Sequence, residues 1–561
     1  MRIARRLLNS ALALSLAATF AISAHGVSSA RQAPAGMPTI RLGYLENNPQ
    51  WAPTLDPAVV EDQNSSYLTQ LLYGGLINIK QVGGRVVPYP QLASRYKVTG
   101  SGKIYTFSLR KTGFANGDPL TAQDVVFSIR RALSKQTNSP INTYDSMIKG
   151  FANYSAGKSS YLGVKALNAR TVQFTLSVRA GFFPEVLAYP LNFILDAKVM
   201  RGTSTNSGGT YLTTTCKAAA AGASGPFKAV CHSSAANDVT SFYPGGSTPT
   251  LTLVPNSHFY QKAHVRLVIP AIDSNQTGLR DFRSGGLDET FGVPTQDQAT
   301  YRGKPGAYQF PTAFIEYLGM NVNDPPFSNV HCRLAVAYAI DRVTLAKKYL
   351  HGAYKPLYSF VPGGFQGYFN GHSGVPYYDP AKARQQLAKC PGGINVTYVY
   401  RNDTTDRNAE AAAITAMLAT VGIHFTPKGV PRSEWLNYIA RDTPLSKTHT
   451  AACYGDWFED YPDSQDYFYN LLYGGVAENF SGYNNKTFNK LIDEADAAAN
   501  QSTRARLYLR ANKMMLNQAP VVPYDNGTAF DLVNTKKVHG LIPDNYRAVT
   551  WAKNNDWANV S

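Results

Sequence analysis

Residues 102–128, GKIYTFSLRKTGFANGDPLTAQDVVFS, carry the pattern that decides the fold. Apolar and polar side chains alternate from Ile104 to Leu109, which is the period of a half-buried strand. The turn Gly117-Asp118-Pro119 follows, and Thr121 is placed to cap a helix that runs from Ala122 to about Leu133. A strand that leads through a tight turn into an amphipathic helix indicates a mixed α/β protein.

The same alternation of strands and helices continues on both sides of this stretch. We expect strands at 39–44, 92–110, 396–400 and 521–524, and helices at 65–76, 122–133, 407–420, 484–500 and 503–517, with a further helix that begins at Asp379-Pro380. A chain of 561 residues is too long for one hydrophobic core, and no short repeat is present. The sequence therefore predicts an α/β fold in several lobes.

The composition excludes some functions and leaves others open. The formal charge is +17, but the basic residues are spread along the chain without a Lys/Arg run, an RNP-like motif or a zinc-finger spacing. We therefore expect no nucleic-acid binding. The 35 Tyr and 26 Phe suit either a broad ligand-contacting surface or the cores of many short strands.

The first thirty residues are typical of a secretory signal peptide. Three arginines within residues 1–6 precede an apolar run from Leu7 to Ala24, and small residues follow as far as Ala30. We predict export with cleavage after residue 30; an uncleaved membrane anchor is the alternative. The first cysteine is Cys216, so a lipid-modified N-terminal cysteine is not expected.

Five cysteines occur in the part expected to be exported. Cys216 and Cys231 bracket a Gly/Ala-rich segment, and an oxidising compartment would allow them to form a disulfide. We expect the remaining three, Cys332, Cys390 and Cys453, to be buried thiols. No C-x-x-C motif occurs and the ten histidines show no ligand spacing, so neither a metal site nor a cofactor is predicted.

Residues 456–467 concentrate acidic and aromatic side chains in an otherwise basic chain. A carboxylate held in a cleft can form a charge-assisted hydrogen bond with a free α-amino group, while neighbouring aromatic rings exclude water. The candidate binding residues are Trp457, Phe458, Glu459, Asp460 and Tyr461. A solvated acidic turn or a calcium loop is the alternative, but the glycine-containing EF-hand spacing is absent.

Three segments together resemble the family 5 extracellular solute-binding proteins, which are oligopeptide, dipeptide and nickel receptors of ABC importers. They are residues 92–128, residues 321–342 with Pro325-Pro326-Phe327, and residues 457–463. The resemblance implies a two-lobe, type II periplasmic-binding-protein-like fold with an extra subdomain and a hinge. Its expected parts are lobe I at 39–73, 198–300 and 520–561, the extra subdomain at 74–197, and lobe II at 305–519.

The resemblance also assigns roles to single residues. In similar peptide receptors an Asp in a W-x-x-D-Y context pairs with the N-terminal ammonium of the peptide, and this motif falls on Asp460. An extended stretch after the Leu55-Asp56-Pro57 turn pairs with the ligand backbone in these families. That stretch would place Gln63 and Asn64 in the site.

The implied function is that of an exported substrate-binding protein that captures short peptides in a cleft between lobes. It would be a monomer in the periplasm or at the outer face of the cytoplasmic membrane, and would deliver ligand to a permease whose ATPase is a separate chain. A receptor for a nickel chelate or a sugar is the alternative ligand class.

An exported serine hydrolase of the penicillin-binding type is the alternative of another class. Ser94 and Ser155 each begin an S-x-x-K match, and Lys111 begins a K-T-G match. The first serine lies only a few residues before the alternating stretch of the predicted strand that ends at Arg110, and the second follows the K-T-G, which reverses the order that this chemistry needs. We therefore expect no enzymatic activity.

Overall fold

The computed structural model describes residues 36–45, 54–203, 216–231, 250–439, 450–476, 478–544, 546–547 and 549–561. The predicted signal peptide, residues 1–30, lies outside these ranges, as does most of segment 201–249. Residues 37–561 form one compact unit. None of the helices in the described ranges is both long enough and apolar enough to span a bilayer.

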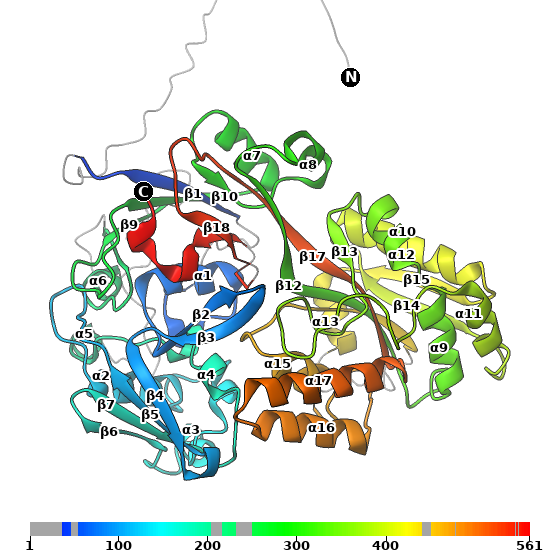
Figure 1. Ribbon diagram of the computed structural model, residues 1–561, viewed down its shortest axis with the longest axis horizontal. Helices are drawn as coiled ribbons and strands as arrows, with labels where there is room; N and C mark the ends of the chain where they lie inside the picture. Colours follow the sequence, from blue (N-terminus) through cyan, green and yellow to red (C-terminus); the bar gives the residue numbers. More distant parts are fainter. Residues whose placement is uncertain are drawn as a thin grey trace, which may run out of the picture. The chain divides into compact units, whose positions relative to one another are not determined.

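A mixed sheet connects most of the strands (Figure 1). β1 pairs in parallel with β10 and β11, whereas β12 pairs antiparallel with both β16 and β17. Its strands, in spatial order, are β15 (His424–Val430), β14 (Asn395–Arg401), β16 (Ala452–Trp457), β12 (Ala307–Met320), β17 (Val521–Val533), β11 (Glu289–Thr290), β1 (Thr39–Leu45), β10 (Arg266–Ile272), β9 (Thr250–Pro255) and β8 (Phe227–Ala229), and β13 (Tyr354–Pro356) also pairs with β17. The strand predicted at 521–524 is thus the start of a much longer one.

The two long strands β12 and β17 lie side by side in the middle of this sheet (Figure 1). Ala307 is opposite Leu532 at one end of the pair, and Gly319 is opposite Val521 at the other. The register shifts between Pro311 and Ile315 and again directly after Glu316. Such irregularities bend and twist a strand locally. The two strands therefore connect the β1–β11 part of the sheet to the β14–β16 part through a bent ribbon.

The stretch 102–128 forms a strand and a helix, as predicted. The strand expected over 92–110 is a hairpin, because residues 100–102 turn the chain between two shorter strands. These belong to a four-stranded sheet in the order β4 (Ala93–Thr99), β5 (Ile104–Leu109), β7 (Thr171–Thr175) and β6 (Val164–Asn168). α2 (Ala122–Ala132) begins after Thr121, whose backbone N–H donates to the Asp124 carboxylate at 2.9 Å. Two further hairpins pair β2 (Ile77–Val82) with β3 (Arg85–Pro90) and β18 (Leu541–Asp544) with β19 (Val549–Ala552).

The Leu55-Asp56-Pro57 turn is held by its buried aspartate. The Asp56 carboxylate accepts the backbone N–H of Ala58 at 3.0 Å and thereby caps a short 3-10 turn, Pro57–Val59. The same carboxylate receives both terminal nitrogens of Arg131, with Nη1 at 2.9 Å from Oδ1. Both side chains are almost fully buried. Asp56 therefore joins the turn to the last turn of α2.

The first helix differs from the prediction at both ends. α1 (Gln63–Leu72) begins two residues earlier than expected, because the Asp62 side chain caps it by accepting the N–H of Ser65 at 2.8 Å. It ends at Leu72, where Tyr73 has extended backbone angles. The extended stretch expected at Gln63 is therefore wrong, since Gln63 lies in the first turn of a helix.

The other helices cover the sheets and pack on one another. α15 (Ser464–Leu472), α16 (Lys486–Ala497) and α17 (Gln501–Leu516) pack together beside β12 (Figure 1). The rest are α3 (Phe151–Ser155), α4 (Phe183–Val186), α5 (Ala197–Thr203), α6 (Cys216–Ala221), α7 (Asn275–Arg283), α8 (Thr295–Tyr301), α9 (Val330–Ala339), α10 (Arg342–Thr344), α11 (Pro380–Leu387), α12 (Thr405–Ala419) and α13 (Arg432–Ile439). The helices predicted at 407–420, 484–500 and 503–517 and from Asp379-Pro380 are present within a few residues of these bounds.

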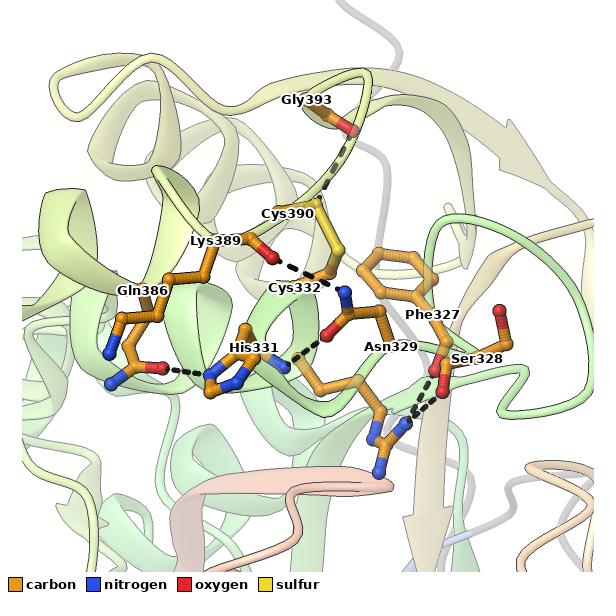
Figure 2. Close-up of a disulfide and its surroundings, with 10 residues drawn as sticks. Phe327, Ser328, Asn329, His331, Cys332, Gln386, Lys389, Cys390 and Gly393 are labelled. Atoms are coloured by element: carbon orange, nitrogen blue, oxygen red, sulfur yellow. Dashed lines mark hydrogen bonds between the residues drawn. A yellow bond between two sulfur atoms is a disulfide. The ribbon is translucent and has the colours of Figure 1, made fainter.

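Two disulfides are present. Cys216 is bonded to Cys231. The prediction that Cys332 and Cys390 are thiols is wrong, because α9 packs against α11 and brings their Cα atoms to 5.0 Å, which is disulfide distance. Figure 2 shows the helices joined on either side of this bond: Asn329 Nδ2 donates to the carbonyl of Lys389 at 3.2 Å, and His331 Nδ1 lies 2.7 Å from Gln386 Oε1. Cys453 is a free, buried thiol.

Candidate functional site

A cavity of about 710 Å³ lies where two distant parts of the chain meet. Residues 140–147 and 177–182 line one side, and residues 457–470 and 493–497, with Val476 and Glu478, line the other. Three of the predicted residues are on its wall, namely Trp457, Asp460 and Tyr461. Phe458, Glu459, Gln63 and Asn64 are not among the lining residues.

The loop that carries Asp460 is folded around a buried carboxylate. β16 ends at Trp457, and α15 begins at Ser464 after Asp463, which caps the helix by accepting the N–H of Gln465 at 2.9 Å. In the first turn of α15, the Asp466 carboxylate accepts the indole N–H of Trp457 at 2.8 Å and the backbone N–H of Asp460 at 3.0 Å. Asp466 therefore fixes the positions of two cavity residues, a role that the sequence did not assign to it.

The carboxylate of Asp460 is half-buried and meets a side chain from the opposite wall. The hydroxyl of Tyr144 donates a hydrogen bond to Asp460 Oδ2, across 316 positions of sequence. Burial raises the pKa of Asp460 to about 6, the hydrogen bond from Tyr144 opposes this rise, and the charge of Glu478 adds to it. At neutral pH the group is mostly ionised. No pattern in the sequence identified Tyr144 as part of the site.

Aromatic rings form the walls beside Asp460. The ring of Tyr461 lies parallel to that of Phe182, with centroids 6.1 Å apart, and meets Tyr144 edge to face at 5.8 Å. The Tyr461 hydroxyl donates to Gln465 Oε1. Tyr461 comes from the predicted segment, whereas Phe182 and Tyr144 come from the opposite wall. The stacked pair thus joins the two walls of the cavity.

Glu459 and Phe458 lie outside the cavity wall. Glu459 is buried, and its Oε2 atom lies 3.3 Å from the hydroxyl of Tyr467. Burial raises the pKa of Glu459 well above its usual range. Phe458 is half-buried. Glu459 is therefore an internal group that does not face the cavity.

Gln63 and Asn64 occupy the first turn of α1. The side chain of Gln63 is exposed, and its Nε2 donates to the hydroxyl of Tyr67 one turn later. The charge of Glu459 contributes to the raised pKa of Tyr67, after the larger effect of burial. The start of α1 thus lies within electrostatic range of the 457–461 segment, although it does not line the same cavity.

The two walls are in direct contact next to the cavity. The backbone N–H of Gly181 donates to the carbonyl of Asp496 at 2.6 Å, and a Cβ atom at position 181 would lie 2.0 Å from the carbonyl oxygen of Ala498. Gln501 Nε2 donates to Glu185 at 2.9 Å. A side chain at position 181 would clash with this carbonyl oxygen, so the close contact of the two walls requires glycine there.

A separate group of buried acids could hold either a cation or shared protons. The carboxylates of Glu316, Glu410 and Asp525 have oxygens within 4.8 Å of one another. Burial raises the pKa of all three, and the Arg407 guanidinium, 3.6 Å from Glu316, opposes the rise for Glu316 and Glu410. None of the three is among the residues that line the cavity beside Asp460.

Comparison with known proteins assigns the chain to a family. The family model described as "Bacterial extracellular solute-binding proteins, family 5 Middle" matches residues 87–479. The oligopeptide-binding protein OppA of Bacillus subtilis is 24% identical over 493 residues, which cover 84% of this chain and 85% of that protein. A probable deoxycholate-binding periplasmic protein of Escherichia coli, YgiS, is 26% identical over 502 residues, with 86% and 87% covered.

Solved structures show the same fold. The unliganded open form of the periplasmic murein tripeptide-binding protein MppA superposes with a TM-score of 0.75 at 20% identity, over 94% of this chain and 97% of that one. The ABC transporter substrate-binding protein CtaP of Listeria monocytogenes also gives 0.75, at 18% identity, over 93% and 99%. The predicted α/β, periplasmic-binding-protein-like fold is confirmed. The chain is a member of the bacterial extracellular solute-binding proteins of family 5.

Proposed function

We propose that this chain is the exported substrate-binding protein of an ABC importer and that it captures short peptides by their free α-amino group. The observation that carries the proposal is an ionised Asp460 on the wall of a cavity that aromatic rings also line. Relatives support a peptide ligand: OppA of Haemophilus influenzae was solved with the peptide RPPGFSPFR, and DppA of Helicobacter pylori with STSA.

The cavity would recognise an ammonium group through Asp460. The α-ammonium of the peptide donates to the carboxylate in place of, or beside, the Tyr144 hydroxyl, and this bond joins two opposite charges, whereas the tyrosine donor is uncharged. Trp457 and Tyr461 cover the first residues of the ligand and exclude water. Gln63 and Asn64, in the first turn of α1 and outside the cavity wall, would contact only a part of the ligand that extends beyond the cavity, through side chains rather than main-chain pairing.

The domain division supports capture between lobes. We assign lobe I to residues 39–73, 198–300 and 520–561, its extra subdomain to 74–197, and lobe II to 305–519. With these bounds the cavity lies between the extra subdomain and lobe II, since 140–182 and 457–497 line opposite sides. The bent strands β12 and β17 then serve as the hinge. A ligand that contacts both sides stabilises the closed state over the open one.

The remaining parts of the proposal concern partners and activity. The receptor acts as a monomer in the periplasm or at the outer face of the cytoplasmic membrane, and its permease and ATPase are separate chains. It is not an enzyme: Ser94 and Lys97 of the S-x-x-K match lie on strand β4, where successive side chains alternate between faces instead of sharing a helical turn.

The ligand class is tested by thermal shift of the chain without residues 1–30 against tripeptide pools, nickel chelates and sugars. We expect stabilisation by peptides with a free amino group. Stabilisation by another class and none by peptides would contradict the proposal.

The anchor is tested with Asp460→Asn. We expect binding of free-amine tripeptides to weaken by at least about tenfold, with little change for the already weak N-acetylated forms, because only the former present an ammonium group. Asp118→Asn, at an exposed position outside the cavity, is the matched control. Equal losses for both kinds of peptide would remove Asp460 from the anchor role.

A further inference from the structure

A buried carboxyl group lies in the contact between the two walls of the cavity. Glu185 is on α4, which directly follows the wall segment 177–182, and its side chain is fully buried. Its Oε1 atom accepts a hydrogen bond from Gln501 Nε2 at 2.9 Å and lies 3.6 Å from Arg504 Nη1. Both partners are in the first turn of α17. Separation of the walls would therefore return this carboxyl group to water.

The two members of this ion pair depend on it to different degrees. Arg504 has further acceptors on its own side of the contact: its Nη2 donates to the Asp463 carboxylate at 2.6 Å, and its Nε donates to the Ala495 carbonyl at 3.3 Å. The Oε2 atom of Glu185, by contrast, is buried and accepts no hydrogen bond from the described part of the chain. An ionised carboxylate with an unpaired oxygen is costly in the interior. Separation of the walls thus relieves Glu185 and still leaves Arg504 paired.

The titration of Glu185 agrees with this geometry. Burial raises its pKa to about 8, the charge of Asp463 adds to the rise, and the charge of Arg504 opposes it. In water the pKa of a glutamate is about 4.3, so the contact is favoured at low pH, and this contribution is lost as the pH rises from about 4 to about 8. The charged and titratable groups that act on Glu185 are Arg504 of α17, Asp463 before α15, Tyr105 of β5 and Tyr96 of β4, while Lys80 and Tyr89, on the strands β2 and β3 that also pack against α4, lie against each other.

We propose that Glu185 is a pH-sensitive latch between the two walls: its protonated carboxyl favours their contact, and its ionised carboxylate favours their separation. When the walls separate, the carboxyl O–H of Glu185 releases its proton to water, and no other covalent bond changes. The inference rests on the proposed capture of ligand in this cavity, because a receptor has to open to exchange its ligand. It adds that opening becomes easier as the pH rises.

Hydrogen exchange of the Gly181 amide tests the latch without any ligand. This N–H donates to the Asp496 carbonyl across the contact, so its exchange with solvent reports separation of the walls. Mass spectrometry of the peptic fragment that contains Gly181 in the full chain should show protection falling by at least about tenfold from pH 6 to pH 8, after correction for the intrinsic rate. In Glu185→Gln, which keeps an acceptor for Gln501 but does not titrate, the fall should be at least about tenfold smaller.

Two further variants complete the test. Glu494→Gln removes a 48% exposed carboxylate of α16 that pairs only with Lys490 and should follow the parent chain. Gln501→Leu removes a donor that stabilises ionised Glu185, so the midpoint of the profile should move upward. Melting temperatures show that each variant is folded. A flat profile in the parent chain, an identical profile in Glu185→Gln, or no upward shift in Gln501→Leu would overturn the latch.

The consequence for ligand exchange is measured separately. Dissociation of a fluorescent tripeptide at pH 8, followed by stopped flow, should be at least about threefold slower in Glu185→Gln than in the parent chain, because the walls separate less readily. Equal rates would overturn the role of Glu185 in ligand exchange. If no peptide binds, the proposed function fails, but the exchange of the Gly181 amide still decides whether the latch exists.

Discussion

The carboxyl group of Asp460 has the properties that an ammonium anchor requires. It is half-buried, so an ion pair formed there is screened less than one on the surface, but it is still ionised at neutral pH. Its backbone is fixed by Asp466, and its side chain is held by Tyr144. The anchor is therefore positioned before the ligand arrives, which lowers the entropic cost of binding.

The titration of Asp460 makes binding pH-dependent. Since only the ionised carboxylate pairs with an ammonium, affinity for a free-amine tripeptide should fall as the pH drops through about 6, and be about tenfold lower at pH 5 than at pH 7.5. Tyr144→Phe removes a hydrogen bond that lowers this pKa, so the midpoint should move upward. Calorimetry from pH 5 to 8 measures it, with the N-acetylated peptide as control. A flat profile would contradict the assignment.

Asp56 belongs to the Leu55-Asp56-Pro57 turn, which the sequence predicted without showing what holds it in place. Because Asp56→Asn leaves the buried Arg131 guanidinium without a counter-charge, we expect the free energy of unfolding to fall by about 3 kcal/mol or more. Urea denaturation measures the change. Asp118→Asn breaks a pair with Lys198, whose side chain is 82% exposed, and should cost less than about 1 kcal/mol. Similar losses for the two variants would show that the Asp56 pair does not join the turn to α2.

At the scale of elements, the sequence pattern predicted those strands and helices whose formation depends on residues close to one another in the chain. The alternation at 104–109 and the periodicity of 122–133 correspond to β5 and α2, because each buries one face. The two-residue error at the start of α1 comes from Asp62, a cap that the apolar pattern does not show. The Cys332–Cys390 bond joins residues 58 positions apart and depends on the packing of α9 on α11. Tyr144 and Phe182 were missed for the same reason, since only the tertiary fold brings them to Asp460.

The bond between α9 and α11 should contribute measurably to stability. Cys332→Ser/Cys390→Ser should lower the free energy of unfolding by about 2–4 kcal/mol, because the unfolded chain regains the freedom of a long loop. Cys216→Ser/Cys231→Ser opens a shorter loop, with a separation of 15 residues, and the chain-entropy model predicts a loss about 1 kcal/mol smaller. Urea midpoints of both variants test this, and an unchanged midpoint for the first would refute it.

At the scale of the whole molecule, many acids are buried in a basic protein. Burial raises the pKa of Asp145, Asp496 and Asp531 to about 7 each. A carboxyl group whose pKa is higher in the folded than in the unfolded chain keeps its proton longer when folded. These groups therefore favour the folded state at low pH, and their contribution is lost as the pH rises from about 4 to about 7.

The free energy of unfolding should accordingly be higher at pH 5 than at pH 8. Asp145→Asn replaces a buried acid by a neutral side chain of the same shape, so it should reduce the difference between these pH values by about 2.5 kcal/mol. Urea denaturation at pH 5, 6, 7 and 8 measures the difference. If stability instead rises toward pH 8 and the variant follows the parent chain, these acids are ionised in the folded state.

Cys453 has a practical consequence. Four of the five cysteines are oxidised in pairs, and the fifth is buried within strand β16, where burial raises the pKa of its thiol. The native chain should therefore be inert to maleimide. A single cysteine introduced at Val178, an exposed residue on the cavity wall, could then be labelled alone with a fluorophore. Its emission would report ligand-driven movement of that wall with every native cysteine left in place.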